Sequence, residues 1–129
     1  MSIELMYLAA IAFVTALMWV PYITNMIIVR GLMDAVGYPD NPKTMTPWAV
    51  RMKSAHANAV ENLVVFASLV LVANALGISN DTTVLACVIY FWARVVHFAV
   101  YAVAIPFLRT LAFVAGVVGQ VMLAVQIFA

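Results

Sequence analysis

The 129 residues are 67% hydrophobic and only 9% charged, and the formal net charge is +1. A soluble globular domain carries about 25% charged residues, so this composition excludes a water-soluble surface. The near-neutral charge also excludes the clustered basic face of a nucleic-acid-binding protein. Together with a mean hydropathy of +1.12, the composition indicates an integral membrane protein.

Four apolar segments are each long enough to cross a bilayer core, which requires about 20 residues. They run from about Ile3 to Val29, Trp48 to Leu76, Thr82 to Ile105 and Phe107 to Ala129. The first has no Lys or Arg before it and is too long for the core of a signal peptide, so we expect it to remain as a spanning helix. The sequence therefore predicts an all-α integral membrane fold, a single up-down bundle of four transmembrane helices over residues 1–129.

The first segment contains Pro21, which we expect to kink the helix, and Asn25, which we expect to face protein rather than lipid. The connection that follows, Gly31 to Pro47, is rich in glycine, proline and asparagine, a composition that predicts a loop.

The second segment begins with a polar third. Ser54, Asn58, Glu61 and Asn62 recur at spacings of three and four and therefore share one helix face, which His56 flanks. Charged and strongly polar side chains at membrane depth cost about 2.5–3.5 kcal/mol each. We therefore expect this face to contact protein or a water-filled cavity.

The third segment follows a turn, Gly77 to Asp81, whose Ser, Asn and Asp side chains can cap the helix, and we expect Pro106 to end it. Arg94, His97 and Tyr101 form one line along it at i, i+3 and i+7. Cys87, inside the apolar run, is interpreted as a small packing residue.

Glu61 on the second segment and Arg94 on the third lie at matching depths. An opposite-charge pair is the least costly way to keep both groups in hydrocarbon, so we expect an ion pair between them. Such a pair either fixes helix packing alone or also serves a ligand.

The fourth segment has Arg109 near its start as its only charge. Ala112, Gly116 and Gly119 place small side chains on one side, which permits close helix approach, and Gln120 must find a polar partner. We interpret this side as a packing or subunit contact.

Lysine and arginine residues flank the first and third connections, whereas the second has only Asp81. The positive-inside rule then places the first and third connections in the cytoplasm and both termini on the outer side. The residues that carry this assignment are Arg30, Lys43, Arg51, Lys53 and Arg109.

A cationic group of side chains is expected at the cytoplasmic boundary. Its members are Arg30, Arg51, Lys53, His56, Asn58, His97, Tyr101 and Arg109. A basic pocket above apolar helices suits an anionic, water-soluble ligand that meets a lipid-soluble one, because arginine pairs with carboxylates and lowers the pKa of a nearby thiol. The alternative for the basic residues around the first connection is topology and headgroup contact. We expect no metal, since the histidines and Glu61 lack a compact ligand spacing.

Three stretches carry this polar pattern: Arg51 to Asn62 (RMKSAHANAVEN), Ala93 to Tyr101 (ARVVHFAVY) and Pro106 to Arg109 (PFLR). In combination they resemble the MAPEG family, membrane-associated proteins in eicosanoid and glutathione metabolism, and the helix count and order match over the whole chain. The sequence departs from the family pattern at Ala57, where eicosanoid-processing members tend to carry arginine. Arg109 also follows Tyr101 by eight residues instead of nine, and Thr110 could replace a serine hydroxyl found in some members.

The resemblance implies a homotrimer that binds glutathione in a cytoplasm-facing site between neighbouring helix bundles. The implied glutathione-binding residues are Arg30, Arg51, Asn58, Glu61, Arg94, His97 and Tyr101. Of these, Arg30 and Arg51 would meet the glutathione carboxylates. The implied catalytic residues are Arg109, which would stabilise the thiolate, and Tyr101.

These expectations combine into a glutathione-dependent membrane transferase or peroxidase that acts on hydrophobic electrophiles or lipid hydroperoxides. The alternative is a non-catalytic lipid-binding or scaffold protein of the same fold, because the family contains a member without catalytic activity. A proton-coupled transporter that uses Glu61 and His97 is less favoured, since four helices show no broken-helix repeat.

Overall fold

The computed structural model describes residues 1–129 and contains helices but no strands. The helices are α1 (Ile3–Leu17), α2 (Trp19–Arg30), α3 (Leu32–Val36), α4 (Pro47–Ala75), α5 (Asp81–Ala102) and α6 (Pro106–Phe128). Four stretches are long and apolar enough to cross a membrane: Ile3–Arg30, which joins α1 to α2, and the helices α4, α5 and α6. The expected all-helical fold with four long apolar helices is confirmed.

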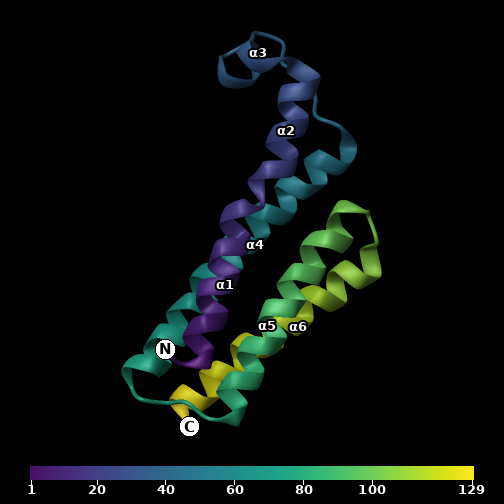
Figure 1. Ribbon diagram of the computed structural model, residues 1–129. Coiled ribbons are helices and arrows are strands. Elements are labelled where there is room, and N and C mark those ends of the chain that lie inside the picture. The colour runs from purple at the N-terminus through teal and green to yellow at the C-terminus, as the bar shows by residue number, and fades with distance from the viewer.

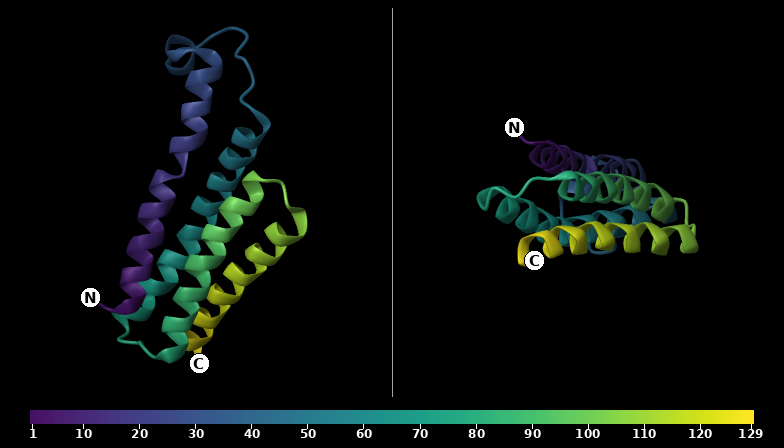
Figure 2. Two further views of the ribbon diagram at one scale, coloured as in Figure 1. Left: turned by 45° about the vertical axis from the view of Figure 1, so that its right-hand side comes forward. Right: turned by 90° about the horizontal axis from the view of Figure 1, so that it is seen from below.

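The four long stretches run alternately up and down. Both termini and the α4–α5 turn lie at one end, whereas α3 and the α5–α6 turn lie toward the other (Figure 1 and Figure 2). The α1–α2 stretch runs along α4, while α5 and α6 form the closest pair of helices. The upper part of α2 and α3 extend beyond the α5–α6 turn.

The first spanning stretch is interrupted just before Pro21. Helix α1 ends at Leu17 and α2 begins at Trp19, with Met18 between them. Proline has no N–H, so the carbonyl of Leu17 loses its helical donor, and the chain tightens locally as the N–H of Met18 donates to the carbonyl of Thr15 at 3.2 Å. The structure therefore interrupts the helix one turn before Pro21, where the sequence predicts a kink.

Two connections differ from the sequence-based expectation. The Gly31–Pro47 connection, expected to be a loop, contains the short helix α3, which starts after Gly31 turns the chain at a φ of +78°. The third spanning helix ends at Ala102 rather than near Ile105, because Ala104 takes a left-handed φ of +61°. Pro106 then opens α6 within its first turn, where a missing N–H costs no helical hydrogen bond.

The start of α5 confirms the expected cap. The side-chain oxygen of Asn80 accepts hydrogen bonds from the N–H groups of Thr82 and Thr83, at 2.9 and 3.1 Å. The Thr83 hydroxyl accepts in return from the N–H of Asn80 at 2.9 Å, which completes a capping box.

The core lies toward the end that holds the termini and is built by four helices. Its fully buried members are Ile11, Phe66, Val70, Ala86, Cys87, Tyr90 and Leu123. The rings of Phe66 and Tyr90 stack at 3.8 Å between centroids, and the burial of Cys87 agrees with a packing role. Gly116 and Gly119 of α6 face α5, so the small side chains of α6 serve packing within one chain.

Candidate functional site

Polar residues from α4, α5 and α6 meet near the α5–α6 turn around two adjoining cavities, which share Tyr101 and Arg109. One cavity, of about 280 Å³, is lined by Asn58, His97, Tyr101, Arg109, Thr110 and Phe113. The other, of about 210 Å³, is lined by Arg51, Tyr101, Ala104, Ile105, Pro106 and Arg109. We call the two cavities together the Tyr101 cleft.

The predicted line on α5 leads from the helix interior into this cleft. Arg94 and His97 are buried, whereas Tyr101, at the end of the line, is half-buried. The rings of His97 and Tyr101 meet edge to face with their centroids 5.5 Å apart. The helical spacing of three and four residues thus carries the line from the protein interior to the wall of the cleft.

Arg109 lies against Tyr101 although the two residues belong to different helices. The guanidinium carbon of Arg109 lies 4.8 Å from the centre of the Tyr101 ring, within the range of a cation–π contact. Tyr101 is in the last turn of α5 and Arg109 in the first turn of α6, so the short turn between them brings the pair together. The separation of eight residues therefore still places both at one site.

Arg51 links α4 to the same turn. Its Nε donates a hydrogen bond to the carbonyl oxygen of Ala102 at 3.0 Å. This carbonyl is in the final turn of α5, where carbonyl groups lack helical donors. Arg51 therefore satisfies the end of α5 and also lines the Tyr101 cleft.

The predicted ion pair between Glu61 and Arg94 is wrong within one chain. Nη2 of Arg94 donates instead to the side-chain oxygen of Asn58 at 2.6 Å, and its Nε and Nη1 have no hydrogen-bond partner. Glu61 is exposed, because α4 turns Asn58 toward α5 and Glu61 away from it. Two residues at equal depth on neighbouring helices meet only if each helix is rotated so that they face each other. The rotation of α4 about its axis therefore decides that Arg94 contacts Asn58 and not Glu61.

Asn58 also begins a polar chain that reaches α6. The side-chain amide of Asn62 donates to the carbonyl of Asn58 at 2.9 Å, and Gln120 donates to the carbonyl of Asn62 at 3.3 Å. Gln120 thus has the polar partner that its position requires. Together with the bond from Arg94, these contacts join α4, α5 and α6 inside the bundle.

Some predicted site residues lie away from the Tyr101 cleft in the single chain. Arg30 donates to the carbonyl of Lys43 at 2.6 Å and so closes the connection that holds α3. His56 faces α2, where its Nδ1 shares a hydrogen bond of 2.7 Å with the Tyr22 hydroxyl. Glu61 is exposed on α4, and neither cavity is lined by it.

The cleft also contains wall residues that sequence reasoning missed. Phe113 lies one turn beyond Arg109 on α6, with its ring centroid 6.4 Å from that of His97. Ile105 and Pro106 form part of the second cavity. In a chain so rich in apolar residues, such positions carry no signal that distinguishes them from lipid-facing ones.

The sequence profile of the MAPEG family matches residues 6–129. The chain belongs to the MAPEG family. This match confirms the resemblance and makes the chain a membrane protein of the family of glutathione and eicosanoid metabolism. No individual curated protein matches the chain. No group of three or more His, Cys, Asp or Glu side chains is arranged to hold a metal ion.

Proposed function

We propose that this MAPEG protein is a glutathione-dependent membrane transferase or peroxidase that acts on hydrophobic electrophiles or lipid hydroperoxides. The observation that carries the proposal is the contact of Arg109 with Tyr101 in a cleft that Asn58 and His97 also line. Members of the family generally use glutathione, which agrees with a cleft of this chemistry.

The residues of the Tyr101 cleft fit glutathione, a tripeptide with two carboxylates and a thiol. Arg51 and Arg109 are the charged side chains of the two cavities, and no Asp or Glu lines either of them. An anionic ligand therefore meets a cationic wall, on which Asn58 and His97 add groups that form hydrogen bonds. Volumes of about 210 and 280 Å³ leave room for part of a tripeptide, the rest of which extends beyond the single chain.

Bound glutathione supplies the sulfur that attacks the electrophile or the peroxide oxygen. Arg109 acts on this sulfur through charge, because a nearby cation favours the thiolate over the thiol. Tyr101 holds the Arg109 guanidinium by its ring, while its hydroxyl is free to donate to the same sulfur. Arg51 positions the tripeptide through a carboxylate.

An apolar surface hollow lies beside the Tyr101 cleft on two of the same helices. A cavity of about 340 Å³ between α5 and α6 is lined entirely by hydrophobic residues, and Leu108 and Ala112 on its wall flank Arg109 along α6. A substrate dissolved in the bilayer would find an apolar binding surface here, one residue from Arg109 along α6. The apolar lining supports a lipid-soluble second substrate.

We propose in addition that the protein assembles as a homotrimer. Glu61 is exposed within a spanning helix. Exposure of a carboxylate to lipid is costly, so a second copy that covers Glu61 would remove that cost. A neighbouring subunit would also bring Arg30 and Glu61, which stand apart from the cleft in one chain, to the glutathione site.

The alternative is a non-catalytic lipid-binding or scaffold protein of the same fold. The polar chain from Arg94 through Asn58 and Asn62 to Gln120 favours this alternative, since it ties three helices together without needing a ligand. Such a protein would keep the polar chain but would not need a cationic cleft that opens around Tyr101.

Isothermal titration with glutathione in detergent separates the two functions. We expect saturable binding that Arg51→Ala weakens by about tenfold, corresponding to the loss of one charge-assisted contact. Lys53→Ala is the matched control, because Lys53 is an exposed cation on the same helix that does not line the cleft. Absence of saturable binding by the wild-type protein would contradict the proposal and favour the scaffold.

A further inference from the structure

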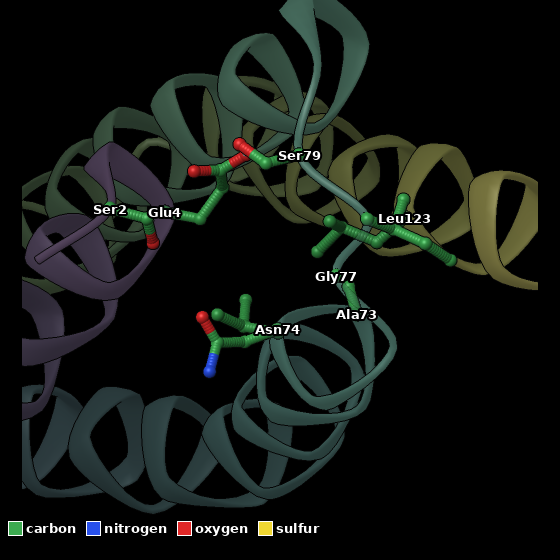
Figure 3. A pocket seen from close by; sticks show the side chains of 9 residues that line it. Ser2, Glu4, Ala73, Asn74, Gly77, Ser79 and Leu123 are labelled. Atoms are coloured by element: carbon green, nitrogen blue, oxygen red, sulfur yellow. The ribbon is translucent and has the colours of Figure 1, made fainter.

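A second polar cavity lies at the opposite end of the bundle, beside the chain termini. Its lining residues are Ser2, Glu4, Val70, Ala73, Asn74, Gly77, Ile78, Ser79 and Leu123, and its volume is about 100 Å³ (Figure 3). We propose that this cavity binds a small monovalent cation such as Na⁺ on the carboxylate of Glu4. The proposal is independent of glutathione, since no residue of the Tyr101 cleft takes part.

Glu4 is held in a fixed position by hydroxyl groups of the neighbouring helix and turn. One carboxylate oxygen, Oε1, accepts hydrogen bonds from the hydroxyls of Ser79 at 2.8 Å and Thr83 at 2.5 Å. The side chain is only 6% exposed. Its second oxygen, Oε2, is buried without any hydrogen-bond partner. One carboxylate oxygen therefore has no protein partner, and Glu4 is one of the residues that line the cavity.

The other polar groups of the cavity carry oxygen. Ser2 and Ser79 offer hydroxyl oxygens, and Asn74 offers an amide oxygen from the side opposite Glu4 (Figure 3). Carboxylate, hydroxyl and amide oxygens are the ligands that hard cations prefer.

No basic side chain compensates Glu4. The six Lys and Arg residues of the chain are Arg30, Lys43, Arg51, Lys53, Arg94 and Arg109. None of them, and neither histidine, lines this cavity. The other acidic side chain at this end, Asp81, is exposed in the first turn of α5 and increases the negative potential. An ionised Glu4 thus has no cationic side chain beside it, and its charge is met only by hydroxyl donors and by the dipole at the start of α1.

The single carboxylate selects the charge of the ion. Divalent cations are generally bound by several carboxylates, whereas one carboxylate with neutral oxygens balances one positive charge. A volume of about 100 Å³ holds an ion with a few waters. A small inorganic cation therefore fits the cavity best.

The test compares thermal unfolding of the full-length protein in detergent as NaCl replaces choline chloride at constant ionic strength, which keeps screening of surface charges equal. A ligand that binds only the folded state raises the unfolding midpoint with its concentration. We expect Na⁺ to raise the midpoint of the wild-type protein by several degrees and to leave that of Glu4→Gln unchanged. Asp81→Asn, which removes an exposed carboxylate at the same end, should respond like the wild type.

Two results would overturn the proposal. A wild-type midpoint that does not depend on Na⁺ would mean that the cavity binds no ion. An equal Na⁺ response in Glu4→Gln would assign the effect to other sites. If Glu4→Gln does not fold, sodium-23 relaxation of the wild-type protein decides the matter: saturable line broadening supports the site, and its absence contradicts it.

Discussion

Arg94 is the only lysine or arginine side chain that is buried in this protein, with 1% of its surface exposed. It forms one hydrogen bond, from Nη2 to the side chain of Asn58. A buried charge that loses its partner is strongly destabilising, because the desolvation cost stays while the interaction disappears. Asn58 therefore acts at once as the partner of Arg94 and as a wall of the Tyr101 cleft.

This contact predicts energetic coupling between Asn58 and Arg94. Asn58→Ala should lower the free energy of unfolding by about 1.5–3 kcal/mol, the usual range for a hydrogen bond to a charged group. In the double-mutant cycle with Arg94→Leu, the combined loss should be smaller than the sum of the single losses. Chemical unfolding in detergent measures all three variants.

Glu61→Gln is the control for Asn58→Ala, because Glu61 lies less than one turn from Asn58 on α4. Because Glu61 is exposed in the single chain, its coupling to Arg94 should be close to zero in a monomeric preparation. Stronger coupling of Arg94 to Glu61 than to Asn58 would contradict the observed contact and restore the ion pair expected from the sequence.

At the residue scale, helical spacing predicted the line on α5, but it did not predict that α4 would turn Asn58 inward and Glu61 outward. The line of Arg94, His97 and Tyr101 lies together because one helix fixes it. The partner of Arg94 depends on the rotation of α4 against α5, which the packing of the whole bundle determines. Glu4 stands out in the sequence as a carboxylate in an apolar run, yet its contacts with Ser79 and Thr83 join positions far apart in the chain.

Helices α5 and α6 approach each other more closely than any other pair, and glycine makes this possible. A Cβ atom added at Gly119 would lie 2.8 Å from the carbonyl oxygen of Ala86 and 3.3 Å from the backbone nitrogen of Tyr90. A Cβ atom at Gly116 would lie 3.5 Å from the side chain of Arg94, which is an ordinary contact. The two glycines are therefore not equivalent, although they share one face of α6.

Substitution by alanine should have different effects at Gly119 and Gly116. Gly119→Ala must push α6 away from the α5 backbone, so we expect a loss of about 1–3 kcal/mol in the free energy of unfolding. Gly116→Ala should be neutral or stabilising by up to about 1 kcal/mol, because alanine favours the helix and the space exists. Unfolding of both variants under one set of conditions tests this, and equal losses would contradict the packing described for α6.

At the element scale, the long apolar runs predicted four spanning stretches to within a few residues, because length and hydropathy dominate such segments. The ends of the connections were less predictable. Proline in the Gly31–Pro47 connection indicated a loop, yet the five residues of α3 follow Gly31 before the first of these prolines. At the α5–α6 turn, the left-handed Ala104 ends α5 early, and an alanine gives no sign of that conformation.

For the whole molecule, the up-down arrangement places α3 and the α5–α6 turn toward one end and the termini at the other. The basic residues of the connections then predict which end faces the cytoplasm. In a Cys87→Ala background, Asp40→Cys should resist an impermeant thiol reagent applied from outside, whereas Asp81→Cys should react. Both positions are exposed, so the difference reports sidedness rather than burial. Labelling of position 40 from outside would contradict the orientation.

The Tyr101 cleft depends on single residues, on a turn between two helices and on the packing of a third helix. The turn between α5 and α6 brings Arg109 into contact with Tyr101, and Arg51 and Asn58 of α4 complete the walls of the cleft. If this cleft activates glutathione, the charge of Arg109 must lower the pKa of the bound thiol. A free thiol has a pKa of about 8.5, and a neighbouring cation lowers it to between about 3.5 and 7.5.

The ultraviolet absorbance of the thiolate in the glutathione complex near neutral pH measures this effect directly. The wild-type complex should show thiolate absorbance that free glutathione lacks, and Arg109→Ala should lose most of it while retaining much of the affinity. Arg109→Lys should restore part of the signal, because it keeps the charge without the planar guanidinium. A correctly assembled Arg109→Ala protein with undiminished thiolate absorbance, or a wild-type complex with none, would contradict the account.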